Sequence, residues 1–147
     1  MNKFLYYFSW SVIILLIGLV LLCGYWLLFP YNPLEINYPE NRNVLLVENR
    51  EVKGGEHLTI HLDFCKNTNI VPIISAWFVD GLLYQSADVP AFPKKTGCQK
   101  VNLQIYVPKG LPEGEFAIQR TYSYKMNPLR TIHVTFKTET FTISHNK

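Results

Sequence analysis

An uninterrupted apolar segment near the N-terminus constrains this chain more than any other feature. From Phe4 to Phe29, 26 residues carry no charge, and the first acidic residue is Glu35. A helix of this length reaches about 39 Å, whereas the hydrocarbon core of a bilayer is about 30 Å thick. Amphipathic aromatic rings favour the two membrane interfaces, and both ends of the segment are aromatic: Tyr6, Tyr7 and Trp10 at one, Tyr25, Trp26 and Tyr31 at the other. Residues 1–31 are therefore predicted to form a transmembrane signal anchor.

Two alternatives to a membrane span are a cleaved signal peptide and a lipidated signal. The apolar region is longer than the roughly 7–15 residues of a signal peptide, and no small-x-small cleavage motif follows it. Cys23 resembles the modified cysteine of bacterial lipoprotein signals, but Leu22 stands where those signals need a small residue. We interpret Cys23 as an ordinary thiol that faces lipid or another helix, and lipidation stays open.

The charges that flank the segment predict its orientation. Lys3 and the α-amino group precede it, and Glu35 and Glu40 follow it before Arg42. Because positive charge is retained on the cytoplasmic side, we expect a cytoplasmic N-terminus and a periplasmic or otherwise extracytoplasmic C-terminal domain.

The rest of the chain is long enough for one small domain. Residues 32–43 contain two prolines and are predicted to be a short tether, and residues 44–147 alternate between apolar and polar as strands do. Strands are expected over residues 44–49, 57–65, 71–79, 82–86, 100–107, 115–126 and 130–143. The last strand changes phase between Phe136 and Phe141, which predicts a β-bulge near Thr138–Thr140. About seven antiparallel strands indicate an all-β sandwich.

The strand order resembles that of an immunoglobulin-like or fibronectin-III-like sandwich. Trp77 lies on the third strand, where that superfold buries a tryptophan, and residues 111–116 resemble the corner before the sixth strand, with Phe116 in place of a tyrosine. The overall format also resembles small single-span proteins encoded by bacteria and tailed bacteriophages. These resemblances imply a fold and do not imply a function.

The same resemblance implies a disulfide between Cys65 and Cys98. In such a sandwich the second and fifth strands are antiparallel neighbours, so the end of one lies beside the start of the other, within reach of a disulfide. The alternative is two unrelated free cysteines. A disulfide would place the domain in an oxidising compartment, in agreement with the orientation predicted from Lys3.

Several classes of function are not favoured by the sequence. A net charge of +3 is too small for a nucleic-acid-binding surface. His57 and His61 are separated by roughly 13 Å along one strand, too far to share a metal ion. The chain has no Cys-x-x-Cys, no Gly-x-Ser-x-Gly and no phosphate-binding glycine loop, and its 11 carboxylates are scattered. We therefore expect no metal, no cofactor and no enzymatic activity, with a hydrolase whose site is dispersed as the weakest alternative.

Candidate contacts with a protein partner lie on the long loop 86–99 and on the sixth strand. They are Phe92, Lys94, Lys95, Arg120, Tyr122 and Tyr124. The alternatives are a solvated crossover for the loop, and for Arg120 a position at a sandwich edge or a pair with Glu139. The predicted function is a non-enzymatic binding or structural module that is displayed at a membrane and contacts a protein partner, in an envelope or phage–host setting. An assembly or chaperone-like factor that uses the exposed edge of the last strand, with Thr131, Thr135, Lys137 and Thr138, is the second possibility. The oligomeric state is left open.

Overall fold

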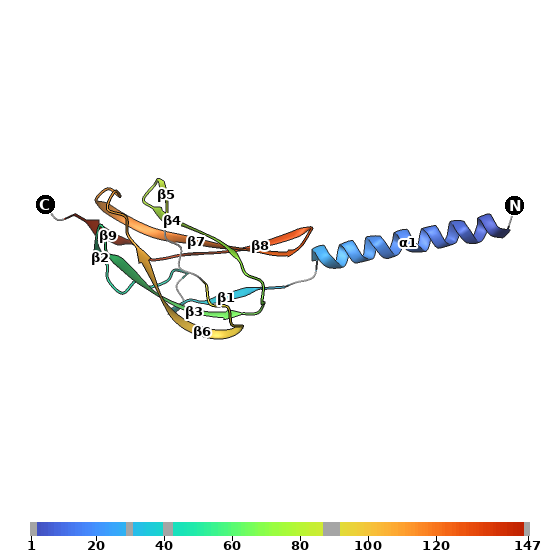
Figure 1. Cartoon of the computed structure of the whole chain (residues 1–147), viewed down its shortest axis with the longest axis horizontal. Helices are drawn as coiled ribbons and strands as arrows, with labels where there is room; N and C mark the ends of the chain where they lie inside the picture. The colour runs from blue at the N-terminus through green and yellow to red at the C-terminus, as the bar shows by residue number, and fades with distance from the viewer. Residues whose placement is uncertain (1–2, 29–30, 40–42, 87–91, 146–147) are drawn as a thin grey trace.

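The computed structural model describes residues 3–28, 31–39, 43–86 and 92–145, which form one long helix followed by a β domain (Figure 1). Helix α1 spans Lys3–Leu28. Its stretch from Tyr6 to Leu28 is long and apolar enough to span a membrane or to act as a signal sequence, and none of its most apolar part is buried. Outside its C-terminal end, α1 exposes apolar side chains on every described side, a surface that a helix of a soluble domain would bury.

The β domain consists of two open sheets that face each other as a sandwich (Figure 1). The first sheet is antiparallel and has the order β1-β3-β6, with β1 Leu34–Asn37, β3 His57–Lys66 and β6 Gly97–Tyr106. The second has the order β2-β9-β7-β4-β5, with β2 Glu51–Lys53, β9 Phe141–Ser144, β7 Gly114–Asn127, β4 Ile73–Val79 and β5 Leu83–Gln85. Strand β8, Arg130–Lys137, also pairs with β7.

The core lies between the sheets and follows directly from the alternation of the strands. The inward-facing buried apolar residues of the main strands are Leu58, Ile60, Leu62 and Phe64 on β3, Leu103 and Ile105 on β6, Ala76 and Phe78 on β4, and Phe116, Ile118, Tyr122 and Tyr124 on β7. Because successive side chains of a strand point to opposite faces, the residues between them form the outer faces of the two sheets.

The predicted β-bulge in the last strand is confirmed. Phe116 of β7 pairs with Phe141 and Gln119 pairs with Lys137, so three steps along β7 correspond to four on the opposite chain. Thr138 fills the irregularity: its amide donates to the Ile118 carbonyl, and its hydroxyl oxygen accepts from the Ile118 amide, both at 2.9 Å. The phase change therefore keeps both Phe136 and Phe141 in the core.

Four details of the strand prediction are wrong. The described residues contain nine strands, because Leu34–Asn37 of the expected tether is β1 and because the bulge divides the last strand into β8 and β9. Residues 44–49 form only isolated bridges at Leu45 and Val47, and the strand lies further along, at Glu51–Lys53. That strand, β2, is parallel to β9, so the sandwich is not wholly antiparallel. Strands β1, β2 and β9 are only three or four residues long, too short for a periodic pattern to define, so their pairing with other strands decides where they form.

Trp77 is not buried as the immunoglobulin-like resemblance implied. In β4 the neighbours Ala76 and Phe78 point into the core, so Trp77 lies half-buried on the outer face. The inward position that the resemblance assigned to the tryptophan is filled by Phe78, whose ring packs edge-on against Phe141 at 6.5 Å.

Candidate functional site

The outer face of the β3–β6 pair carries a run of matched cross-strand partners, which we name the outer-face ladder. Four of its five facing pairs interact directly: the rings of His57 and Tyr106 at 5.5 Å between centroids, His61 Nδ1 and Asn102 Oδ1 at 2.9 Å, Lys100 Nζ and Asp63 Oδ2 at 3.4 Å, and Cys65 with Cys98. The fifth pair is Thr59 and Gln104. Facing pairs on one side of a sheet are the unit of sheet stabilisation, so this face is held rigid along its length.

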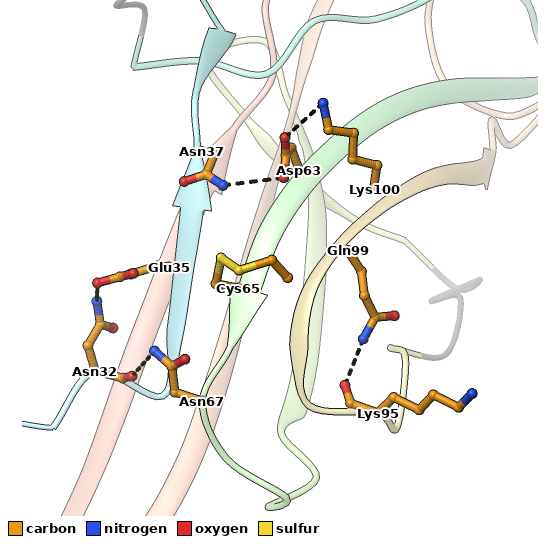
Figure 2. Close-up of a disulfide and its surroundings, with 10 residues drawn as sticks. Asn32, Glu35, Asn37, Asp63, Cys65, Asn67, Lys95, Gln99 and Lys100 are labelled. Atoms are coloured by element: carbon orange, nitrogen blue, oxygen red, sulfur yellow. Dashed lines mark hydrogen bonds and ion pairs between the residues drawn. A yellow bond between two sulfur atoms is a disulfide. The ribbon is translucent and has the colours of Figure 1, made fainter.

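The disulfide between Cys65 and Cys98 is confirmed and closes the ladder at one end (Figure 2). The two residues are direct register partners of β3 and β6, with their Cα atoms 3.9 Å apart. Beside them, Asn67 donates to the Asn32 carbonyl at 3.1 Å and Gln99 donates to the Lys95 carbonyl at 2.9 Å. The disulfide thus lies in a network that also holds the segments just before β1 and just before β6.

A groove of about 420 Å³ opens beside the ladder, where the edge of β3 passes from one neighbour to another. Strand β1 stops pairing at Asn37, opposite Asp63, and Val47 bridges to Ile60 further along β3. The groove is lined by Asn37, Tyr38, Pro39, Leu46, His61, Leu62, Asp63, Lys100, Val101 and Asn102. A concave surface that combines apolar walls with a few convergent polar groups is the usual form of a binding site.

The polar groups of the groove are held in fixed positions by one another. One oxygen of Asp63 accepts from Asn37 Nδ2 at 3.3 Å, and the other pairs with Lys100. The Asn102 side chain fixes the orientation of His61. The Tyr38 hydroxyl adds a hydrogen-bond donor to this wall of the groove, and burial raises its pKa above the ordinary value. This arrangement is suited to hydrogen-bonding a peptide surface, and within the described residues no three His, Cys, Asp or Glu side chains gather to hold a metal ion.

The prediction that Phe92 forms an exposed contact is wrong. Its side chain is 9% exposed and its ring lies between the two sheets, 4.7 Å from the ring of Phe64 and 4.6 Å from that of Tyr122. The direction of the Phe92 ring is determined by the space between the inward-facing rings of Phe64 and Tyr122. The flanking prolines do not determine it. Residues 87–91 of the same loop lie outside the described residues. Lys94 and Lys95 are exposed, as predicted.

Lys66 holds this loop in place, a role that sequence reasoning missed. Its side chain is buried, and its ammonium group donates to the carbonyls of Pro93 at 3.1 Å and Lys94 at 3.4 Å. It also lies 5.8 Å from the centre of the Phe92 ring, and desolvation lowers its pKa. The signal was present in the sequence, because Lys66 continues the inward phase of Leu62 and Phe64.

Arg120, Tyr122 and Tyr124 are also not surface contacts, because all three are fully buried on the inward face of β7. They share the phase of Phe116 and Ile118, which determines their direction. The Arg120 guanidinium lies 5.5 Å from the centre of the Tyr122 ring. Burial raises the pKa values of Tyr122 and Tyr124 to about 12 each, against the opposing effect of Arg120 on Tyr122.

Glu139, suggested from the sequence as a partner of Arg120, bonds to other groups in the described residues. Its carboxylate pairs with Arg50 Nη2 at 3.0 Å and accepts from the Val47 amide at 3.2 Å. These bonds fasten the irregular segment 45–50 to the bulge between β8 and β9, which explains why an acidic residue stands there.

The comparisons with known proteins add little to this picture. No protein-family model matches the chain, and no curated protein sequence matches it. Among solved structures the chain is similar to a Niemann-Pick type C2 protein from the Japanese carpenter ant, with 12% sequence identity and a TM-score of 0.41, over 75% of this chain and 99% of that one. At this level of similarity, function has to be argued from the chain's own residues.

Proposed function

We propose that this chain is a non-enzymatic binding module, anchored by α1 in a membrane with its N-terminus in the cytoplasm, whose β domain contacts a protein partner outside the cytoplasm. The observation that carries the proposal is the groove beside the outer-face ladder. A binding surface that is already ordered loses less conformational entropy when a partner binds. The polar side chains of this groove are ordered in advance, because they bond to one another across β3 and β6. A mixed polar and apolar groove of this kind matches the composition of a protein interface.

The proposed location is supported by the disulfide and by the flanking charges. Disulfides persist in oxidising compartments, and Cys65 and Cys98 form one. Lys3 before α1 and Glu35 after it favour the same orientation.

The proposed sandwich is of the immunoglobulin-like or fibronectin-III-like type. Its support is the strand order, in which β1, β3 and β6 oppose a sheet whose centre is β9, β7 and β4. The choice of sandwich type concerns the architecture only, since many unrelated functions share it. A setting in a bacterial envelope or in a phage–host interaction belongs to the functional proposal, in which the module contacts a protein partner.

Site-specific photo-crosslinking of the full chain in its native membrane tests the partner. A photoreactive phenylalanine analogue at Tyr38 preserves an aromatic wall of the groove, and the same analogue at Thr135 reports on the outer face of the opposite sheet. We expect a discrete adduct from Tyr38 that is absent from Thr135. The variant Asn102→Ala should weaken the adduct, because it removes both a lining group and the orientation of His61. Absence of adducts, or the same adducts from both positions, would contradict the proposal.

The second candidate, an assembly or chaperone-like factor, is favoured by one observation. Strand β8 pairs with β7 along Arg130–Lys137, and among the described residues its other edge is bridged only at its end, where Leu45 meets Lys137 and Thr138. An open edge of this length is a template for an added strand. Proline substitutions at Val134 and at Thr135 test this edge. Successive backbone amides of a strand point to opposite edges, so one of the two prolines removes an amide that bonds to β7 and the other removes an amide at the open edge. Only the second substitution should leave the pairing with β7 intact. Client binding that survives the tolerated proline would exclude this function.

A further inference from the structure

The end of the β domain that faces α1 is joined closely to the end of the helix. Helix α1 ends at Leu28 and β1 begins at Leu34. Asn127, which ends β7 where its connection to β8 begins, donates to the carbonyl of Trp26 at 3.2 Å. On the other side, the Tyr31 hydroxyl donates to the Asn67 carbonyl, in the connection between β3 and β4. Both connections therefore lie at the level where the helix ends (Figure 1).

The level of the helix end is that of the lipid headgroups. Tyr25, Trp26 and Tyr31 are the aromatic residues at this end of the span, and such rings favour the membrane–water interface. A groove of about 260 Å³ lies between the helix end and the β7–β8 connection, lined by Tyr25, Trp26, Tyr31, Met126, Asn127 and Arg130. It combines aromatic walls with a guanidinium, which is the chemistry that accommodates a lipid headgroup and its glycerol backbone.

Exposed aliphatic side chains gather at this same end. Outside α1, the described residues expose five large aliphatic side chains, namely Val71, Ile73, Leu82, Leu83 and Leu129. Leu82 and Leu83 belong to the β4–β5 hairpin at the far end of the domain. Val71, two residues before β4, and Ile73, its first residue, are 75% and 76% exposed beside the helix end, and Leu129, at 54%, lies at the tip between β7 and β8. Side chains this exposed gain little from the fold itself, so another surface explains them better.

The charge at this end is mostly positive. The segments 67–73, 92–99 and 123–133 contain Lys94, Lys95, Lys125 and Arg130 and contain no aspartate or glutamate, whereas the neighbouring strand β1 carries one exposed acidic residue, Glu35, opposite Cys65. Lys94, Lys95 and Lys125 are exposed. Cations beside aliphatic residues, at the level of the headgroups, are the combination that binds an anionic lipid surface.

We propose that this end of the sandwich rests on an anionic lipid surface, with Val71, Ile73 and Leu129 entering the headgroup layer and the four cations contacting lipid phosphates. The inference rests on the proposed membrane anchoring by α1, and it adds that the domain is docked and does not swing freely. A protein covering the same patch is the competing explanation, and the experiment separates the two because it uses pure lipid.

The test uses the full chain in lipid nanodiscs, made of phosphatidylcholine with or without phosphatidylglycerol. An environment-sensitive fluorescent amino acid is placed at Leu129 or Ile73, with Leu83 as the matched exposed control and Ile14, in the middle of α1, as the report on insertion. With anionic lipid, we expect Leu129 and Ile73 to lose accessibility to an aqueous quencher while Leu83 keeps it. In phosphatidylcholine alone, the protection at Leu129 and Ile73 should decrease.

The double variant Lys94→Gln/Lys95→Gln measures the electrostatic part. Each cation near an anionic surface is worth about a fivefold change in binding, so losing two lowers the ratio of docked to free domain by up to about 30-fold. Added salt should act in the same direction. Equal quenching at Leu129 and Leu83 in anionic nanodiscs, with Ile14 protected, would overturn docking while leaving the anchor intact. Exposure of Ile14 would instead overturn the anchoring itself.

Discussion

Replacing both Cys65 and Cys98 with serine tests the contribution of the disulfide to the stability of the domain. The two cysteines are separated by 33 residues, and closing a loop of that length stabilises the folded state by about 3.7 kcal/mol in the chain-entropy model. The folded state should be little disturbed, because the residues face each other on the outer side of a ten-residue strand pair and Cys98 is exposed. The cost therefore falls on the unfolded chain, which becomes freer.

Urea denaturation of the full chain in detergent micelles measures this loss. With a denaturant dependence of roughly 1.5–2 kcal/mol per molar urea, the midpoint should fall by about 2 M. Pulse proteolysis of the β domain reports the folded fraction without interference from the tryptophans of α1. A reducing agent applied to the unaltered chain should produce the same shift, which keeps the test valid if the serine variant folds poorly. Cys23→Ser, in the helix, should leave the midpoint unchanged. A shift below about 0.5 M under both conditions would refute the reasoning, since such a bond would constrain nothing.

Three further outcomes are expected. Phe92→Ala should lower the free energy of unfolding by about 3–5 kcal/mol, because the ring fills the gap between Phe64 and Tyr122. The control Lys94→Ala should change it by less than about 0.5 kcal/mol, and equal effects of the two variants in urea denaturation would contradict the buried position of Phe92. Burial raises the pKa of the Tyr122 hydroxyl in the folded chain to about 12, above its ordinary value of about 10. Its contribution to the free energy of unfolding is therefore complete below pH 10 and is lost as the pH rises to 12. Tyr122→Phe should reduce this loss, and an unchanged dependence of the urea midpoint on pH would contradict the prediction. A reporter that is active only outside the cytoplasm, fused after Lys147, should be active in cells, and an inactive fusion of a stable protein would reverse the proposed orientation.

The parts of the fold that could be predicted from the sequence are those in which one local pattern decides the outcome. The apolar segment predicts α1 without reference to any other residue, and the alternation in residues 57–65 and 100–107 predicts β3 and β6. The disulfide between these two strands was implied by the resemblance to an immunoglobulin-like sandwich, which makes them neighbours. The bulge was also predictable, because a phase change between Phe136 and Phe141 has no other simple cause.

The candidate site was harder to predict, because it depends on which face each strand turns outward and on how short segments pair. The phase of β7 placed Tyr122 and Tyr124 in the core, and that phase was visible in the sequence beside Phe116. The groove was not visible, since it arises where β1 ends at Asn37 and a different segment takes its place at the edge of β3. Nothing in residues 32–47 alone states where that exchange occurs.

The short connection between α1 and β1 limits how far the groove can lie from the end of the helix. Only five residues separate Leu28 from Leu34, so the β domain stays close to the end of α1. Along β3, Asp63 and His61 lie three and five residues from Lys66 on the side away from the helix, which places the groove roughly 10–17 Å from the end of the strand that lies nearest α1. Under the anchoring and docking proposed above, a partner would have to present its binding segment within that distance of the bilayer. Proteins in the same membrane would meet this condition directly, and the two would then find each other by diffusion in two dimensions.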